Sequence, residues 1–339
     1  YEEGIGVEPD QEEAMHYFME GSKLNNADSF YHLARHYQEG IGVTKDDKIA
    51  VQYLEKAAEL GNSNTYSDIA DLYYDNGDYP KAAEYYQKAV DFGNMSALNN
   101  LGDCYRLSKG SSQNLAKAFQ LYKQSADLND CEGLRNVALC YENGWGVQQD
   151  FSKANECYRK AIDLKDKESY GRLGYNYQKG LGCTKDLATA HKLYQKGIDM
   201  NDPVSVTNLA QCYVNGVGVD TNFQRSYLLF KKAADLGNSD AVVELGISHL
   251  KGRGITQDYQ EALKFFKKGI ELNHNKAFYY MGHCYENGIG VTPNLTNAAK
   301  CYQQASKLGN TEARTKLINV QQKAKSKWFS SCLNKTFSE

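Results

Sequence analysis

The sequence predicts an all-α protein built as a solenoid of about nine stacked helix pairs, and two observations lead to this prediction. The first is a short motif that recurs along the chain, most clearly as YENGWGV at 141–147, YQKGLGC at 177–183 and YENGIGV at 285–291. The second is the spacing of the aromatic residue that opens the motif, which is 36 residues at every step but one, where it is 32. A fixed period in this range is typical of stacked supersecondary units. The anchor residues of the nine repeats are Tyr1, Tyr37, Tyr73, Tyr105, Tyr141, Tyr177, Tyr213, His249 and Tyr285.

Two positions that recur from repeat to repeat mark the buried face of the first helix; the set of residues at one such position is called a column. A large apolar residue stands four positions before the anchor, as at Leu33 and Leu173, and alanine or glycine stands three positions before it, as at Ala34 and Gly174. With the anchor they form one helical face. Glycine inside a helix costs about 1 kcal/mol relative to alanine, so we expect a neighbouring helix to approach closely there. The Gly-x-Gly loop then ends the helix, because glycine accepts the left-handed conformation that closes a C-terminus.

The second helix begins with a cap nine residues after the anchor, or at the equivalent place in the shortened third repeat. This residue is always aspartate or asparagine, whose side chain accepts a free backbone N–H and contributes about 1 kcal/mol. Alanine or serine follows four residues later and a large, mostly aromatic residue four beyond that, which places both on the buried face. The predicted caps are Asp10, Asp46, Asp78, Asn114, Asp150, Asp186, Asn222, Asp258 and Asn294.

Departures from the pattern indicate where the array changes and ends. The third repeat, at 73–91, has lost four loop residues, and the last helix carries Ile318 where earlier repeats carry glycine or alanine. We therefore expect the array to cover residues 1–325 and a C-terminal tail to cover 326–339, with Trp328 and Phe329 folded back over the open end. Because the chain opens at an anchor without its preceding helix, we interpret it as a fragment, and homo-oligomerisation through a repeat end stays open.

Composition argues against two classes of partner. The formal net charge of −3 over 339 residues gives no general attraction to nucleic acid or anionic lipid. No apolar run approaches the ~18 residues that a membrane-spanning helix needs. We therefore expect no nucleic-acid partner and no membrane insertion.

The nine cysteines bear on the compartment. Four of them share the column just before the anchor, and we interpret these as free thiols that fill small core sites. This favours a reducing compartment such as the cytoplasm, whereas N-x-S/T triplets at Asn94, Asn294 and Asn334 leave the endoplasmic-reticulum lumen as the alternative. The four cysteines are Cys104, Cys140, Cys212 and Cys284.

No group of residues has the spacing of a catalytic site. His32 and His36 are placed like two metal ligands on one helix, but neither a glutamate between them nor a third ligand is evident. The Gly-x-Gly loops follow helices rather than strands and recur in almost every repeat, so they indicate architecture rather than phosphate binding. We expect no catalytic residue, no metal and no other cofactor, and hence no enzyme.

The combined pattern, A-x3-L-G-x2-Y-x2-G-x-G-V-x2-D-x3-A-x2-Y-Y-x-K-A-A-x-L-G-N, resembles the Sel1-like repeat family, a relative of the tetratricopeptide repeats. Residues 137–183 and 241–309 carry it best, and the third repeat looks more like a tetratricopeptide repeat. The resemblance implies a right-handed α-solenoid that acts as an adaptor in protein complexes, including those of signalling and endoplasmic-reticulum-associated degradation. Some bacterial relatives link the two helices of a repeat by disulfides, but this sequence lacks that cysteine pattern.

The resemblance also implies a binding face. In a right-handed stack the first helices line the concave side, and tetratricopeptide domains use asparagine and basic residues there to hold a peptide main chain and a carboxylate. Aromatic residues would add flat contact area. The residues expected in these roles are Asn100, Asn136 and Asn208 for the main chain, Arg135 and Arg172 for an acidic group or C-terminal carboxylate, and Tyr175 and Tyr279 for flat contacts.

We therefore expect a non-enzymatic scaffold that binds a partner peptide or helix in its concave groove. Asp68, Asp71 and Asp103, nearer the N-terminus, would suit a basic segment instead. Three alternatives stay open: a quality-control adaptor of the endoplasmic-reticulum lumen, the regulatory repeat region of a larger signalling protein such as a kinase, and a hydrolase with its site in the groove, which no sequence feature motivates. Whether the concave or the convex face binds is not decided by the sequence.

Overall fold

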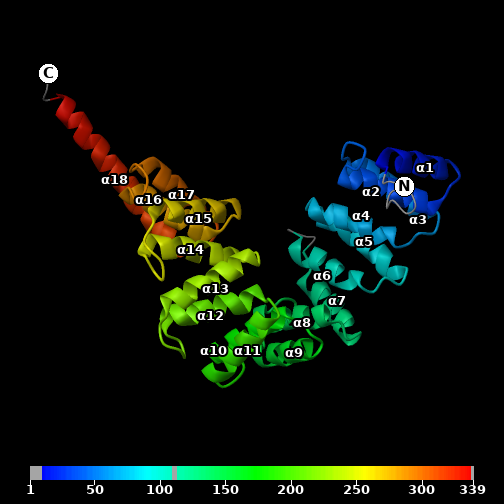
Figure 1. Ribbon diagram of the computed structural model, residues 1–339, viewed down its shortest axis with the longest axis horizontal. Helices are drawn as coiled ribbons and strands as arrows, with labels where there is room; N and C mark the ends of the chain where they lie inside the picture. Colours follow the sequence, from blue (N-terminus) through cyan, green and yellow to red (C-terminus); the bar gives the residue numbers. More distant parts are fainter. Residues whose placement is uncertain (1–9, 109–112, 337–339) are drawn as a thin grey trace. The chain divides into compact units, whose positions relative to one another are not determined.

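The structure, a computed structural model, describes residues 10–108 and 113–336, with side chains described as far as Ser326. Within these residues the regular elements are eighteen α-helices (Figure 1). The even-numbered helices from α2 to α16 contain the predicted anchors and are the first helices of their repeats, and the odd-numbered helices are the second helices. The predicted all-α fold of helix pairs is confirmed.

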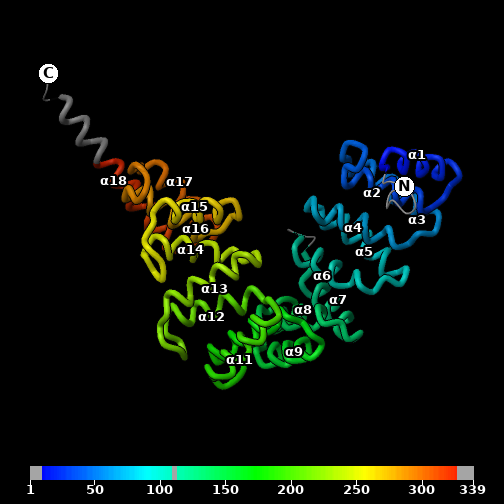
Figure 2. Tube along the Cα trace, viewed as in Figure 1, coloured from blue at the N-terminus to red at the C-terminus, as the bar shows by residue number. Residues whose placement is uncertain are grey.

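The chain divides into two compact parts, residues 1–166 and 167–339, called here the N-terminal half and the C-terminal half. Figure 2 follows the helices of each half along the chain. The N-terminal half contains α1 (Gln11–Lys23), α2 (Ala27–Glu39), α3 (Asp47–Glu59), α4 (Thr65–Asp75), α5 (Tyr79–Asp91), α6 (Ala97–Leu107), α7 (Leu115–Asp127), α8 (Cys131–Asn143) and α9 (Phe151–Asp163). The C-terminal half contains α10 (Glu168–Lys179), α11 (Leu187–Asp199), α12 (Pro203–Asn215), α13 (Phe223–Asp235), α14 (Ser239–Lys251), α15 (Tyr259–Glu271), α16 (Asn275–Asn287), α17 (Leu295–Lys307) and α18 (Thr311–Thr336).

The helix ends follow the sequence closely. All nine predicted caps accept a backbone N–H with their side chains, as Asp150 does from the Lys153 amide at 3.0 Å. At the other end of a first helix, Gly144 adopts the left-handed conformation with φ 71° and donates its N–H to the Cys140 carbonyl. The capping residues that the pattern predicts therefore set the helix boundaries.

The second glycine of the loop has a role that the sequence analysis missed. A Cβ atom on Gly146 would lie 2.2 Å from the Leu115 carbonyl oxygen, and one on Gly254 would lie 2.1 Å from that of Phe223. Leu115 and Phe223 are the first residues of the second helices one repeat earlier. Each of these loops therefore lies against the start of the preceding repeat's second helix, at a distance that only glycine allows.

Glycine inside the first helices has the packing role that was predicted. A Cβ atom on Gly174 would lie 2.6 Å from the Tyr194 ring, which is fully buried. Gly102, Gly246 and Gly282 face the corresponding rings of their own repeats. The close neighbour is thus the aromatic column of the second helix.

The predicted cysteine column lies in the core. Cys104, Cys140, Cys212 and Cys284 are at most 1% exposed. Burial raises the pKa to about 12 for Cys104 and Cys140, and to about 11 for Cys212 and Cys284. These thiols fill core sites, as the sequence predicted.

The last helix is longer than expected. We predicted that it ends near residue 325, whereas α18 extends to Thr336. Ile318 is 51% exposed, in agreement with the absence of a packing helix at that position among the described residues. The expectation that Trp328 and Phe329 fold back concerns side chains outside the described residues, and so does the anchor Tyr1.

Candidate functional site

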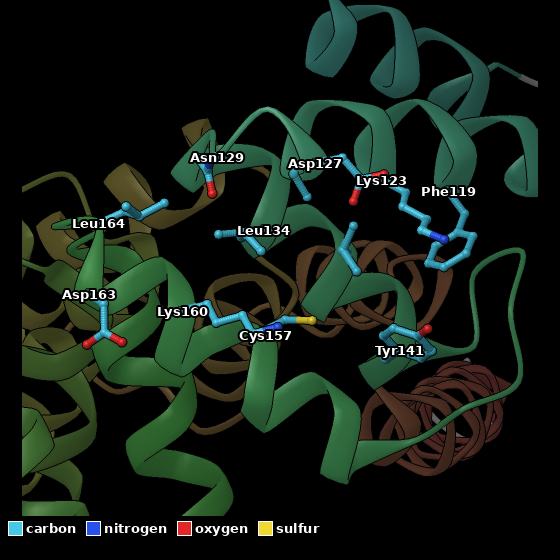
Figure 3. A pocket seen from close by; sticks show the side chains of 12 residues that line it. Phe119, Lys123, Asp127, Asn129, Leu134, Tyr141, Cys157, Lys160, Asp163 and Leu164 are labelled. Carbon is cyan, nitrogen blue, oxygen red and sulfur yellow. The ribbon is translucent and has the colours of Figure 1, made fainter.

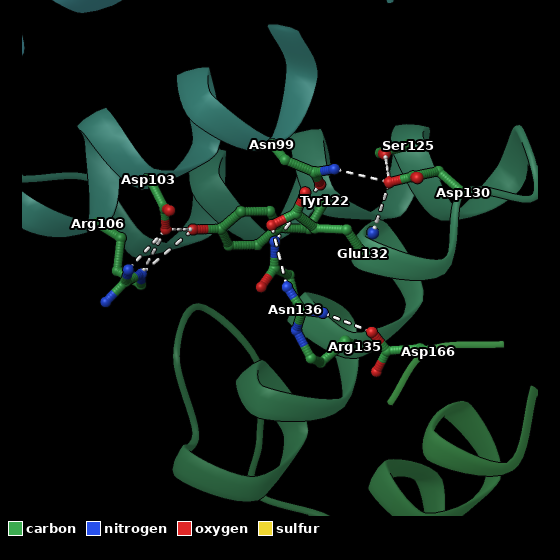
Figure 4. Close-up of polar contacts among 11 residues, drawn as sticks. Asn99, Asp103, Arg106, Tyr122, Ser125, Asp130, Glu132, Arg135, Asn136 and Asp166 are labelled. Atoms are coloured by element: carbon green, nitrogen blue, oxygen red, sulfur yellow. Dashed lines mark hydrogen bonds and ion pairs between the residues drawn. The ribbon is translucent and has the colours of Figure 1, made fainter. Parts of the chain in front are cut away.

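A cluster of polar side chains on the first helices α6 and α8 is centred on Asp130 (Figure 4). This residue caps α8, and its Oδ2 accepts hydrogen bonds from the Gly133 amide at 2.8 Å, from Ser125 Oγ at 2.8 Å and from Asn99 Nδ2 at 2.7 Å. Burial raises the pKa of Asp130, but the hydrogen bonds from Asn99, Ser125 and Gly133 outweigh it and hold the pKa below its ordinary value. One carboxylate thus joins α6, α7 and α8.

Arg135, predicted to bind an acidic group, already has two acidic partners. Its Nη1 donates to Asp166 Oδ1 at 2.6 Å and its Nη2 to Glu132 Oε1 at 3.0 Å. The Arg135 side chain is 16% exposed and that of Asp166 only 5%. A ligand carboxylate would therefore have to share this guanidinium with a buried intramolecular partner.

These two contacts use equivalent positions of consecutive repeats. Arg135 lies 36 residues after Asn99, and Asp166 lies 36 residues after Asp130. In both repeats the side chain six positions before the anchor therefore contacts an aspartate in the turn that leads into the next first helix. At the third occurrence, in the C-terminal half, Gly171 lies so close to Asp202 that a Cβ atom would be 2.7 Å from its Oδ2. The contact is a recurrent link between repeats.

The predicted asparagines of the N-terminal half are placed differently from each other. Asn136 is half-buried and donates to Asn99 Oδ1 at 3.5 Å, so the two asparagines lie side by side on α6 and α8. Asn100 is exposed, and its side chain also hydrogen-bonds to Tyr86. Both present amide groups at the surface of the first helices.

The buried tyrosines of the second helices donate to polar groups of the first helices, which the sequence analysis missed. Tyr122 donates to Asp103 at 2.6 Å, and the Arg106 guanidinium donates to the same carboxylate oxygen while lying over the Trp145 ring. Burial, together with Asp103, raises the pKa of Tyr122. The other such pairs are Tyr86 with Asp71, Tyr158 with Glu142, Tyr194 with Gln178 and Tyr302 with Glu286.

This pairing bears on the three acids that we assigned to a basic partner. Asp71 and Asp103 accept hydrogen bonds from core tyrosines. Burial, and then the charge of Asp71, raises the pKa of Asp68. Two of the three carboxylates therefore have a structural partner.

The remaining predicted residues lie in the C-terminal half. Asn208 on α12 donates to the Gly171 carbonyl on α10 at 3.2 Å. Tyr175 on α10 is 42% exposed, and Lys179 Nζ lies 5.6 Å from its ring centroid. Arg172, also on α10, is half-buried. Tyr279 is half-buried on α16, where its ring packs against Tyr280 and Tyr302, so it lies apart from α10 and α12 in the chain.

The two histidines with metal-ligand spacing have other surroundings. His36 is fully buried with Nδ1 2.9 Å from the Ile41 carbonyl oxygen, and the His32 ring stacks on Phe18 at 4.5 Å. Across residues 10–108 and 113–336, no three His, Cys, Asp or Glu side chains are grouped to hold a metal ion. Nor does any helix of that part combine the length and apolar character needed to cross a bilayer.

Comparison with known protein families identifies the family to which the repeats belong. Eight segments match the Sel1 repeat: residues 1–26, 27–62, 96–130, 131–166, 167–202, 203–238, 239–274 and 276–310. The chain belongs to the Sel1 repeat family. Residues 63–92 match the tetratricopeptide repeat instead, so the different character predicted for the third repeat is confirmed.

Solved structures agree with this assignment. A Sel1 repeat protein from Oxalobacter formigenes is 27% identical, with a TM-score of 0.61, and the match covers 71% of this chain and 99% of that one. A protective antigen of uropathogenic Escherichia coli with an SLR fold is 28% identical, with a TM-score of 0.57 over 89% of this chain. The match spans 66% of the length of the E. coli protein. No curated protein matches the chain.

A more distant likeness concerns the fold alone. The match to the Cut9–Hcn1 hetero-tetramer of APC/C has 15% identity and a TM-score of 0.52, and it covers 80% of this chain and 52% of that one. The chain is an array of helical Sel1 repeats with one tetratricopeptide repeat, a fold that typically serves protein–protein interaction and is generally non-catalytic.

Proposed function

We propose that this member of the Sel1 repeat family is a non-enzymatic scaffold that binds an extended peptide or a partner helix on the face of its first helices. The observation that carries the proposal is the state of Asn136. Its amide makes one hydrogen bond, to Asn99, among the described residues. An asparagine amide offers two N–H donors and a carbonyl, so the remaining groups of Asn136 suit a peptide main chain.

Rigidity supports the same proposal. Asn99 is held by Asp130, and Asp130 is held by three hydrogen bonds from three helices. A binding group whose support is already ordered loses less entropy when a ligand arrives. Asn100, on the neighbouring first helix, would provide a second amide for the same peptide.

The other predicted residues keep separate roles in the proposal. On the C-terminal half, partner contacts would come from Arg172, Tyr175, Asn208 and Tyr279. Arg135 could bind an acidic group of a ligand only if its guanidinium also kept its contacts with Asp166 and Glu132. The buried cysteine column leads us to propose a reducing compartment such as the cytoplasm.

The test distinguishes binding on the face of the first helices from binding elsewhere on the surface. A photo-crosslinking amino acid at position 100 or 136 should capture a partner in host cells, whereas the same group at the exposed Ser152 of the second helix α9 should not. The captured protein, once purified, should bind the Asn100→Ala/Asn136→Ala variant at least tenfold more weakly and bind Ser152→Ala as well as the wild type. A partner that crosslinks equally at all three positions, or whose affinity is unchanged in the double variant, would refute the proposal.

A further inference from the structure

We infer that the N-terminal half has a second docking surface, a groove between the second helices α7 and α9 that accepts an amphipathic partner helix with an acidic and a basic residue one turn apart. The groove lies over α8 and encloses about 580 Å³ (Figure 3). This is within the ~300–1,000 Å³ of ligand-binding clefts. The surface is separate from Asn100 and Asn136.

One wall of the groove carries an unusually small side chain for its position in the repeat. Cys157 lies on its α9 wall, seven residues after the helix cap. In seven of the other repeats the same position has a much larger apolar residue, and only Cys301 repeats the exception. The space that a ring or isobutyl group fills elsewhere is therefore left open here. The larger residues are Tyr17, Tyr53, Tyr85, Leu121, Leu193, Leu229 and Phe265.

The floor of the groove has the pattern of a helix-packing seam. Leu134, Val137 and Tyr141 follow at i, i+3 and i+7 along α8, and Phe119 flanks them from α7 with its ring 5.5 Å from that of Tyr141. Side chains with this spacing form ridges, and the side chains of a partner helix can pack between them. Leu134 is partly exposed, as are the equivalent residues Phe30, Tyr66, Tyr170 and Phe278, whereas Leu98, Val206 and Val242 are at most 2% exposed.

Charged side chains on both walls of the groove favour a partner helix with complementary charges. Each wall carries a lysine followed by an aspartate about one turn later, Lys123 with Asp127 on α7 and Lys160 with Asp163 on α9. Among the described residues these four exposed side chains make no hydrogen bond or ion pair with one another or with a neighbour. A helix with opposite charges four residues apart would pair with both walls at once.

The position of the aspartates strengthens this argument. Asp127 and Asp163 are the last residues of α7 and α9. A helix C-terminus carries a partial negative charge, so a carboxylate there is unfavourable by itself. A basic side chain of a bound helix would neutralise both carboxylates and both helix ends. The apolar floor, the small side chain of Cys157 and the unpaired charges on the walls therefore indicate the same kind of partner helix.

The experiment uses the whole chain and a library of helix-biased 16-residue peptides displayed on phage. Enriched peptides are synthesised, and their affinity and helicity are measured by fluorescence anisotropy and circular dichroism. We expect them to share an apolar i, i+3, i+7 stripe with an acid and a base one turn apart. Cys157→Leu fills the groove with the residue that neighbouring repeats carry, so it should fold normally and weaken binding at least tenfold.

Matched variants make the result decisive. Cys301→Leu is the same substitution at the equivalent position of the other half and should leave affinity unchanged, as should Asn100→Ala/Asn136→Ala. Failure to enrich such peptides, an equal loss in both cysteine variants, or peptides that bind without becoming helical would overturn the inference. So would self-association of the wild type that Cys157→Leu abolishes, because the occupant would then be a second copy of the chain.

Discussion

Replacing Arg135 by leucine should destabilise the N-terminal half far more than replacing a surface arginine. Leucine keeps part of the apolar stem but removes the 2.6 Å ion pair with Asp166, whose side chain is 5% exposed. Removing one member of a buried ion pair costs ~3–5 kcal/mol, and since Arg135 retains 16% exposure we expect about 3 kcal/mol. The control is Arg35→Leu, because Arg35 and Glu39 are 42% and 46% exposed and such a pair contributes about 0.3–0.5 kcal/mol.

The assay combines urea unfolding, followed by circular dichroism, with amide hydrogen exchange. Repeat proteins open locally, so exchange should quicken first in α8, which carries Arg135, and in α9, which ends shortly before Asp166. Equal losses of unfolding free energy in Arg135→Leu and Arg35→Leu would refute the reasoning. The prediction also warns that a charge reversal at Arg135 measures folding as well as binding, which is why the binding tests use asparagines.

Three further perturbations test the rest of the framework. Asp130→Ala should cost about 3 kcal/mol, since it removes a cap and two more hydrogen bonds to a charged group, whereas Asp150→Ala removes a cap alone and should cost about 1 kcal/mol by urea unfolding. Because the pKa of Asp130 is lowered on folding, its contribution should be present at neutral pH and be lost in acid titrations below about pH 4. Tyr158→Phe should cost about 1.5–3 kcal/mol, since it removes a hydrogen bond of 2.7 Å to the Glu142 carboxylate; a cost near zero by thermal unfolding would contradict this. Gly254→Ala should cost more than Gly309→Ala, because both have positive φ but only Gly254 has a backbone atom within 4 Å of the added Cβ; equal melting temperatures would contradict this.

The regular features were predictable because each depends on one residue and its neighbours in sequence. The aspartate or asparagine caps and the first loop glycine are local signals, and the structure places them as expected. The tyrosine hydroxyl partners were missed although the sequence contains a signal. In three repeats with a buried tyrosine the partner is the acid or amide that directly follows the anchor, as at Glu142, and in the two others it is an aspartate two positions before the anchor. In the repeats of Phe230 and Phe266, Val214 and Leu250 follow the anchor instead.

The candidate site was less predictable for a physical reason. Repeat columns place Asn99 and Arg135 on the same face, but they do not say which side chain of the next repeat comes within hydrogen-bonding distance. The partners Asp130 and Asp166 lie 31 residues further on, in a turn rather than in the column considered. A column analysis therefore treats Arg135 as available for a ligand when it is paired within the chain.

The contact of Gly146 with the start of α7 has a consequence for how the protein is made. The loop that covers the beginning of one repeat's second helix belongs to the following repeat. During synthesis, which proceeds at about 5–20 residues per second, the most recently finished helix pair stays uncovered until the next motif has left the ribosome. Growth of the array is thus directional, and each repeat is completed by its successor.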